Sequence, residues 1–307
     1  MSPQKTKKQH YVPQNYLRRF VDANNKLFVF DKIQEKTYSA SVGDVAQERY
    51  FYDIPVEALV PGSTDEYFDP QMMEKEFARI EGHFRIEVDA LLNNTHRGIT
   101  QQQRSTIAFF IMIQMIRTRE FRSTMMDSYT HMGQWAGEMI AQLAMRHDLD
   151  MPSTKVTPIW TEGQQAALHA EIMADTEFQN EIVLHLYNHI WLLGLNNTAK
   201  PLYTSDHPAV KKAHIRSRPF SYDGVGSQGI EIAFPLTPNH ILILRERSYH
   251  QSSALHDGKT IELTEGNVTY FNSLQVQRSY RQIYCSTDDF ALVHQMLKSY
   301  VRKPSPR

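Results

Sequence analysis

The residues with the clearest capacity for chemistry lie between Pro201 and Pro219. Asp206 follows a short apolar strand at Leu202 and Tyr203. Pro208 disfavours a helical conformation at the residue that precedes it, His207. Asp206 is therefore expected at the point where the strand ends and a loop begins. Four cations follow it: Lys211, Lys212, Arg216 and Arg218. A carboxylate beside a cationic loop predicts a site for a polyanion, with the acid at the chemistry and the cations on phosphates.

A second polar group opens the chain. Lys7 and Lys8 precede His10, Tyr11 and Gln14, and Pro13 suits the first turn of a helix. His10 and Tyr11 then lie just before a helix N-terminus, where the backbone dipole favours anions. We expect His10 to act as an acid or base near neutral pH. Tyr11 and Gln14 would contact a base, and the two lysines would contact phosphates.

A third polar group lies on an apolar helix. Residues 107–116 are apolar except for Gln114, and a helix that is apolar all round is buried. Gln114 and Arg117 are one turn apart on this helix, and an unpaired buried guanidinium is costly. Two interpretations of Arg117 remain open: a structural ion pair with a glutamate such as Glu81, or a guanidinium that points into a cavity holding a polar ligand.

The elements that must position these groups follow from hydrophobic periodicity. A stripe from Met73 to Leu91 repeats at three- and four-residue steps and predicts an amphipathic helix. Further helices are expected at 101–146, 164–187, 269–281 and 288–301. Short β-rich runs predict three hairpins, at 27–30 with 37–40, at 191–195 with 202–204, and at 230–234 with 241–244. Helices grouped between β segments favour an α+β fold, with a central buried helical block packed against antiparallel hairpins.

Composition bounds the class of protein. The 307 residues carry 41% hydrophobic and 22% charged residues, which is typical of a globular chain. We expect one domain over 10–301, a basic tail at 1–9 and a short tail at 302–307. The net charge of −1 means that any nucleic-acid binding must come from a local patch. No apolar run is long enough to span a bilayer, and no signal peptide is visible, so a cytoplasmic protein is expected.

Several familiar sites do not occur in the sequence. It has no glycine-rich phosphate loop, no Rossmann fingerprint, no His-Glu-x-x-His and no Gly-x-Ser-x-Gly. The lone Cys285 lies in an apolar strand and is expected to be a buried, inert thiol. None of the fourteen histidines shows a tight metal-ligand spacing with a second histidine and a carboxylate. We therefore expect no metal and no cofactor.

Four segments resemble the domain-of-unknown-function 4238 family: Lys8–Phe20, Gln114–Thr118, Trp191 with Thr204–Pro208, and Pro235–Pro238. The resemblance covers roughly residues 8 to 290. His207 is a departure, because an asparagine is more usual there. The resemblance implies a bacterial or prophage protein, and it implies an anti-phage defence role in which some members act as DNA glycosylases on modified bases.

The expected function is thus a metal-independent DNA glycosylase that flips a modified base out of phage DNA and excises it. Asp206 would stabilise the sugar's oxocarbenium charge or activate water. His10 and Arg117 would complete the catalytic group, with Tyr11, Gln14, Gln114 and Ser205 in the base pocket. Two alternatives remain: a metal-dependent nuclease, and a nucleic-acid-binding or toxin module without enzymatic activity. Direct backbone breaks that need metal would indicate the nuclease.

Overall fold

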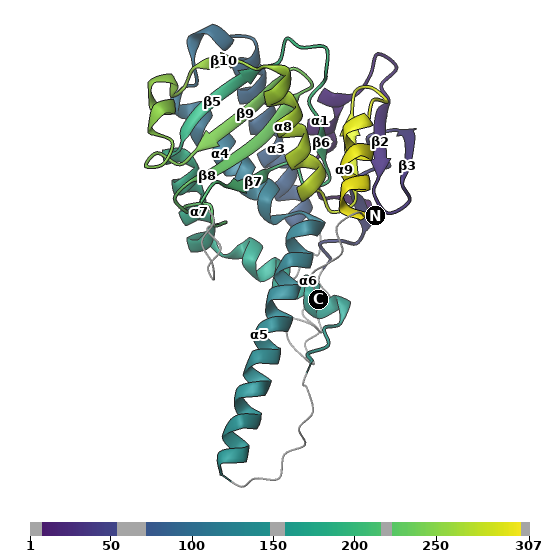
Figure 1. Cartoon of the computed structure of the whole chain (residues 1–307), viewed down its shortest axis with the longest axis vertical. Coiled ribbons are helices and arrows are strands. Elements are labelled where there is room, and N and C mark those ends of the chain that lie inside the picture. Colours follow the sequence, from purple (N-terminus) through teal and green to yellow (C-terminus); the bar gives the residue numbers. More distant parts are fainter. Residues whose placement is uncertain (1–7, 54–71, 148–156, 216–222, 302–307) are drawn as a thin grey trace, which may run out of the picture.

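The computed structural model describes residues 8–53, 72–147, 157–215 and 223–301, and these form an α+β fold, as the sequence predicts (Figure 1). The helices are α1 (Gln14–Leu17), α3 (Met72–Leu92), α4 (Gln101–Ile116), α5 (Arg119–Arg146), α6 (Glu162–Ala174), α7 (Thr176–Asn188), α8 (Glu265–Arg278) and α9 (Ala291–Val301). Short 3-10 turns cover Arg18–Phe20, Thr95–Arg97 and Gln251–His256.

The described strands form three sheets. A five-stranded sheet has the order β10-β5-β9-β8-β7, a four-stranded sheet has the order β3-β2-β11-β6, and β1 pairs with β4. Their bounds are β1 (Lys8–His10), β2 (Leu27–Asp31), β3 (Lys36–Ala40), β4 (Gln47–Arg49), β5 (Ile190–Leu195), β6 (Thr204–Ser205), β7 (Val210–Ala213), β8 (Ile230–Thr237), β9 (His240–Arg245), β10 (Thr260–Glu262) and β11 (Gln282–Cys285). Among the described strands, β10 and β5 pair in parallel, and all other pairs are antiparallel.

The five-stranded sheet is buried on both faces. Alternate residues of β9 face opposite sides, so Leu242 and Leu244 pack with the α3 and α4 side chains, whereas Ile241 and Ile243 pack with α8. Figure 1 shows α8 across one face of this sheet and α3 and α4 behind the other. Burial on both faces explains why β9 is a continuous apolar run rather than an alternating one.

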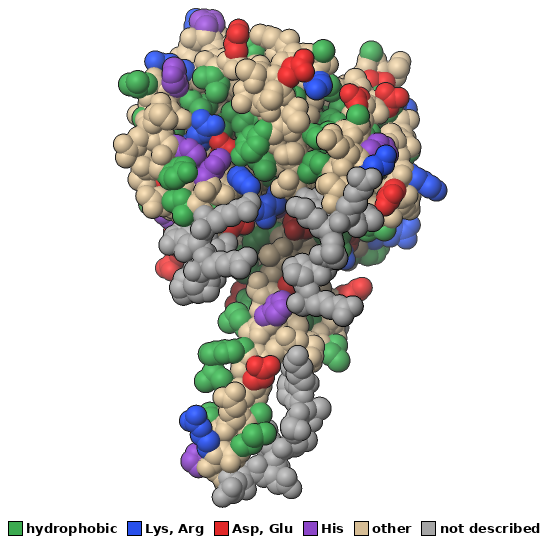
Figure 2. Space-filling view, viewed as in Figure 1, with side chains coloured by type: hydrophobic (Ala, Val, Ile, Leu, Met, Phe, Trp, Pro, Cys, Tyr) green, Lys and Arg blue, Asp and Glu red, His purple; other side chains and the backbone are tan. Residues whose placement is uncertain are grey.

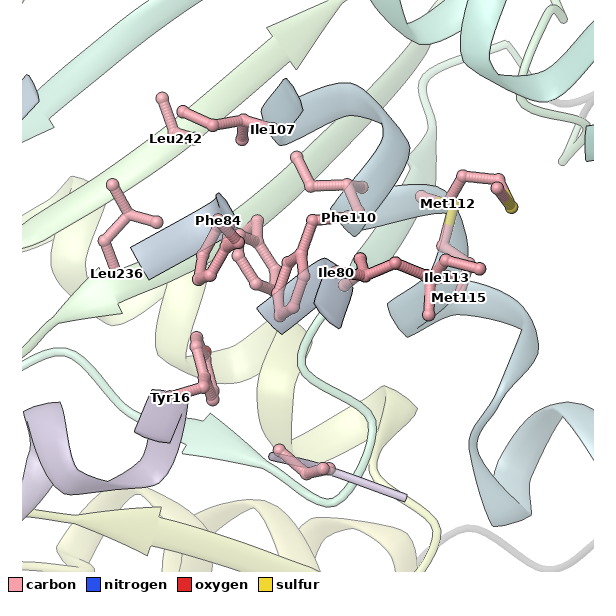
Figure 3. Packing of buried hydrophobic residues seen from close by; sticks show 14 of the residues in the cluster. Tyr16, Ile80, Phe84, Ile107, Phe110, Met112, Ile113, Met115, Leu236 and Leu242 are labelled. Carbon is pink, nitrogen blue, oxygen red and sulfur yellow. The ribbon is translucent and has the colours of Figure 1, made fainter. Parts of the chain in front are cut away.

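Helix α4 is the centre of the core. Phe110 is fully buried and stacks on Phe84 of α3, with ring centroids 3.5 Å apart and planes 9° from parallel. Phe234 of the sheet contacts both rings edge-on. Figure 3 shows these two rings facing each other within the cluster. The prediction that the helix through 107–116 is buried and packs against 73–91 is confirmed.

Two of the three expected hairpins form, 27–40 and 230–244, and one does not. The predicted pairing of 191–195 with 202–204 is wrong: β5 lies between β9 and β10, and β6 pairs with β11 in a different sheet. The amide of Leu202 donates to the Pro238 carbonyl, which turns the chain away from β5. Lys8 and Gln9, expected in a tail, instead form β1 against β4.

Two predicted helices are each divided in two. Thr118 caps α5 by accepting from the Phe121 amide, so the expected helix 101–146 breaks after Ile116. Asp175 caps α7 in the same way through the Phe178 amide, which divides 164–187. A capping side chain competes with the helical backbone for its donors and sets a new helix start. None of the described helices is long and apolar enough to cross a bilayer.

Phe110→Ala should lower the free energy of unfolding by about 3–5 kcal/mol, because the lost ring leaves a cavity against Phe84 and Phe234. Urea denaturation followed by circular dichroism measures this loss. Ile159→Ala is the matched control, since Ile159 is 91% exposed and should change stability by less than about 0.5 kcal/mol. Equal effects of the two variants would show that α4 is not the core.

Candidate functional site

A polar pocket of about 450 Å³ lies where β1, α1 and α3 meet the end of α4. Its lining residues are Lys8, His10, Pro13, Gln14, Asn15, Arg18, Gly43, Glu74, Glu81 and Arg117. Three side chains that the sequence predicts to share a site are therefore together here: His10, Gln14 and Arg117. His10 and Gln14 are four residues apart, and the fold brings Arg117, more than a hundred residues further along the chain, to the same pocket.

Arg117 is held rigidly at the floor of this pocket. It is 1% exposed, and it follows the last residue of α4, where the chain turns into α5. Its guanidinium donates to Glu81 Oε1 at 2.9 Å, to the Tyr52 hydroxyl at 3.3 Å and to the backbone carbonyl of His10. The ring of Phe77 lies against it, 4.1 Å from ring centre to guanidinium carbon. The ion pair with Glu81, one of the two interpretations left open by the sequence, is what the structure shows.

The two glutamates of the pocket are in different electrostatic states. Glu81 is paired with Arg117, whereas Glu74 Oε1 is buried and has no hydrogen-bond partner. Burial raises the pKa of Glu74; the Arg117 charge opposes this rise, and the Glu81 and Asp53 charges add to it. The two side chains are seven residues apart on α3, so they point the same way with about 10 Å between their Cα atoms. Glu74 is the available carboxylate of the site.

His10, Gln14 and Asn15 supply the pocket's neutral polar groups. Burial lowers the pKa of His10, so its imidazole is neutral near pH 7. Its Nε2 lies 3.5 Å from Gln14 Nε2, an orientation that favours the tautomer with an acceptor at that nitrogen. Asn15 donates to the Glu81 backbone carbonyl at 3.4 Å, and its Oδ1 is buried without a partner. Unpaired buried polar atoms are costly, and a polar ligand in this pocket would satisfy them.

Asp206 does not line this pocket, which corrects the expected single cluster of His10, Arg117 and Asp206. Its buried carboxylate accepts three backbone amides, from Tyr280 at 2.8 Å and from Arg281 and Gln282 at 2.7 Å each. Burial raises the pKa of Asp206 to about 6, although these amides act in the opposite direction. Asp206 thus braces the turn before β11. The turn chemistry of the Ser-Asp-His-Pro segment is structural.

The other expected base-pocket residues are also outside this pocket. Tyr11 is buried against Phe51, with ring centroids 5.5 Å apart, and the Ser205 hydroxyl donates to Gln275 Oε1 at 2.7 Å. Gln114 is fully buried, and neither its amide oxygen nor its amide nitrogen has a hydrogen-bond partner. Of the four, only Gln14 reaches the pocket.

Only part of the expected basic segment lies within the described residues. Lys211 and Lys212 belong to strand β7 rather than to a loop, and the Lys211 ammonium donates to the Asp223 carbonyl at 2.7 Å. Lys8 pairs with Asp44 at 3.1 Å on the rim of the polar pocket. Lys7, Arg216 and Arg218 lie outside the described residues. Among the described residues, Lys8 and Arg18 line the pocket in addition to Arg117, and Arg18 was not predicted from the sequence.

A larger cavity of about 590 Å³ lies beside the start of α5 and is mainly apolar, with Met115, Ile116 and Phe178 among its lining residues. His207 reaches this cavity and its Nδ1 contacts the Thr118 hydroxyl at 2.7 Å. Two cations that line this larger cavity already contact Asp223: Lys211 donates to its backbone carbonyl, and Arg278 pairs with its carboxylate. Each cavity holds a buried carboxylate oxygen without a hydrogen-bond partner, Asp223 Oδ1 in the larger one and Glu74 Oε1 in the smaller one. The smaller polar pocket is the better candidate because its guanidinium, Arg117, is buried and fixed, whereas the side chain of Arg278 is 45% exposed.

Glu74 is a residue of this candidate site that the sequence did not predict. It lies next to the apolar stripe of 73–91, where an acid usually faces solvent. Its seven-residue spacing from Glu81 is the signal that places both on one helix face. Within the described residues, no group of three or more His, Cys, Asp or Glu side chains is arranged to hold a metal ion.

The model of one protein family matches the chain over residues 8–289, and its description is "Protein of unknown function (DUF4238)". No curated protein and no solved structure matches the chain. The family match covers both the polar pocket and the Asp206 turn.

Asp206→Asn should destabilise the fold by about 1–3 kcal/mol, because the new amide group places donors opposite backbone donors. Thermal unfolding measures the loss. Asp223→Asn is the control, since its carboxylate is partly exposed and makes one long ion pair of 3.6 Å. If Asp206→Asn kept full thermal stability, the bracing role of Asp206 would be refuted.

Proposed function

We propose, for a chain that belongs to the DUF4238 family of proteins of unknown function, that the polar pocket hydrolyses the N-glycosidic bond of a modified base in DNA. The observation that carries this proposal is the unpaired, partly buried Glu74 beside the fixed pair of Glu81 and Arg117. Sugar hydrolysis commonly uses two carboxylates in different environments. The catalytic base of the proposal is therefore the pocket glutamate Glu74, and Asp206 has a structural role.

The proposed reaction uses water as the nucleophile. Glu74 takes a proton from the water molecule while the water oxygen forms a bond to C1′ of the sugar. The bond from C1′ to the base nitrogen breaks, its electron pair leaves with the base, and the base then receives the proton. Positive charge grows on the sugar during this step, and the Glu81 carboxylate, held in its ion pair with Arg117, would lie where it can stabilise that charge.

Recognition would use the neutral groups of the same pocket. A base flipped from the duplex is read by hydrogen bonds to its edge. Gln14 and the unpaired Asn15 Oδ1 offer such hydrogen bonds, and a pocket of about 450 Å³ lies within the size range of small-ligand sites. Lys8 and Arg18 at the rim would contact the flanking phosphates. The family resemblance to anti-phage proteins supports modified phage DNA as the substrate and the bacterial cytoplasm as the location.

The test is incubation of the protein with modified and plain DNA in the presence of a chelator, with and without alkali. Base loss gives breaks only after alkali, and Glu74→Gln should reduce them by at least about 100-fold. Glu76→Gln is the matched control, because Glu76 lies on the same helix but is exposed and pairs with Arg79. Direct breaks that require a divalent metal would support a nuclease instead, and tight DNA binding with no product would support a binding module.

The pH profile follows from the pKa of Glu74. A general base must be ionised, so kcat/KM should fall as pH drops through that pKa. Because burial raises the pKa of Glu74, the fall should begin nearer to neutral pH than for an ordinary glutamate. Burial also lowers the pKa of His10, so its imidazole gains a proton only at a lower pH than an ordinary histidine does. The measurement is kcat/KM from about pH 4 to 8. A profile that rises with acid would contradict the role of Glu74 as base.

A further inference from the structure

Helix α5 carries an apolar stripe that the described chain leaves uncovered. Its outer half projects from the body of the molecule, and Figure 2 shows hydrophobic side chains along this projection. Five large side chains form the stripe and are each 43–65% exposed: Met132, Trp135, Met139, Ile140 and Leu143. Ala136 lies among them, and the stripe contains no charged residue. An exposed apolar patch of this kind typically marks an interaction surface.

A different face of α5 is already occupied by the returning chain. The Trp160 indole donates to the Thr130 hydroxyl at 3.2 Å, and Gln134 donates to Thr157 at 3.4 Å. At Gly133 a Cβ atom would lie 2.3 Å from Pro158, so the absence of a side chain permits this close contact. With 100° between successive residues, Gly133 and Thr130 point roughly 100° or more away from the centre of the stripe. The stripe therefore lies on a face of α5 that the described returning segment, residues 157–160, does not contact.

The spacing of the stripe is that of a helix-pairing seam. Met132, Ala136, Met139 and Leu143 recur at steps of four, three and four, as in the apolar positions of a coiled coil. The same residues are self-complementary in the antiparallel direction. If Met132 opposes Leu143 of the partner subunit, then Ala136 opposes the partner's Met139, so a small residue faces a long one. Trp135 and Ile140 lie on the two flanks of this seam and widen its apolar surface on both sides.

We propose that two copies of this chain pair through this stripe, with their α5 helices antiparallel and in this register. Taking about 200 Å² for a large side chain, the five residues expose roughly 550 Å² per helix. Pairing would bury about 1,100 Å² in total, near the lower limit for a specific interface. The stripe lies in the outer half of α5, so an antiparallel partner places its body beyond the far end of this helix, away from the first body (Figure 1). The dimer should dissociate on dilution.

Cysteine cross-linking tests the register. Met132→Cys and Leu143→Cys are made as separate variants, in a chain whose own Cys285 is buried. On mild oxidation each variant alone should stay uncross-linked, and a mixture of the two should give a covalent dimer, because residue 132 faces residue 143 only in the antiparallel pair. Cross-linking of each variant with itself would indicate parallel helices and overturn the proposal.

Sedimentation tests the interface itself. The wild-type chain should sediment as a concentration-dependent dimer, and Met139→Glu should be monomeric, because it places two charges inside the apolar seam. Met145→Glu is the matched control: it is the same substitution on the same helix, at a residue 58% exposed but about 120° away from Met139 around the axis. Met145→Glu should remain dimeric. A monomeric wild-type chain, or one that instead binds lipid vesicles through Met139, would refute the proposal.

Discussion

The buried guanidinium of Arg117 is the constraint on which the rest of the structure depends. A charge at 1% exposure must be fully paired, and Arg117 finds its partners on three separate parts of the chain: the His10 carbonyl, Glu81 and Tyr52. These contacts join β1, α3 and the segment after β4 at the point where α4 ends. The core and the polar pocket therefore share one residue, and Glu81 cannot leave the pocket without leaving a buried charge unpaired.

Two carboxylates show how the environment, and not the residue type, assigns roles. The carboxylate of Asp206 accepts hydrogen bonds from three backbone amides, so its negative charge is stabilised by contacts within the fold. Glu74 is also buried in part, yet one of its oxygens has no partner. The first arrangement fixes a turn, and the second leaves an acceptor ready for a proton. For this reason the proposed catalytic base is Glu74 on helix α3 and not Asp206.

Local pattern in the sequence predicted much of the fold and part of the site. The apolar run at 107–116 identified the central helix, and polar residues on an apolar background identified Arg117, Gln14 and His10. Long-range pairing was not predictable, since nothing near Trp191 shows that β5 pairs with β9 and β10 while β6 joins another sheet. Burial is likewise a property of the assembled fold. The sequence around an aspartate at a strand end does not show whether its carboxylate faces solvent or accepts hydrogen bonds from three backbone amides, as that of Asp206 does.

The break between α4 and α5 also has a mechanical side. Helix α5 is about 42 Å long at 1.5 Å per residue; Met125 and Met126 are buried in its first half, the segment 157–160 contacts its middle, and Ala144 is buried near its end. The outer half nevertheless projects from the body, so the helix can act as a lever whose start lies at Thr118, the neighbour of Arg117. A sideways load on the far end of this lever would produce a torque at Thr118. Any partner that grips the outer half of α5 thus pulls on the backbone that positions the guanidinium.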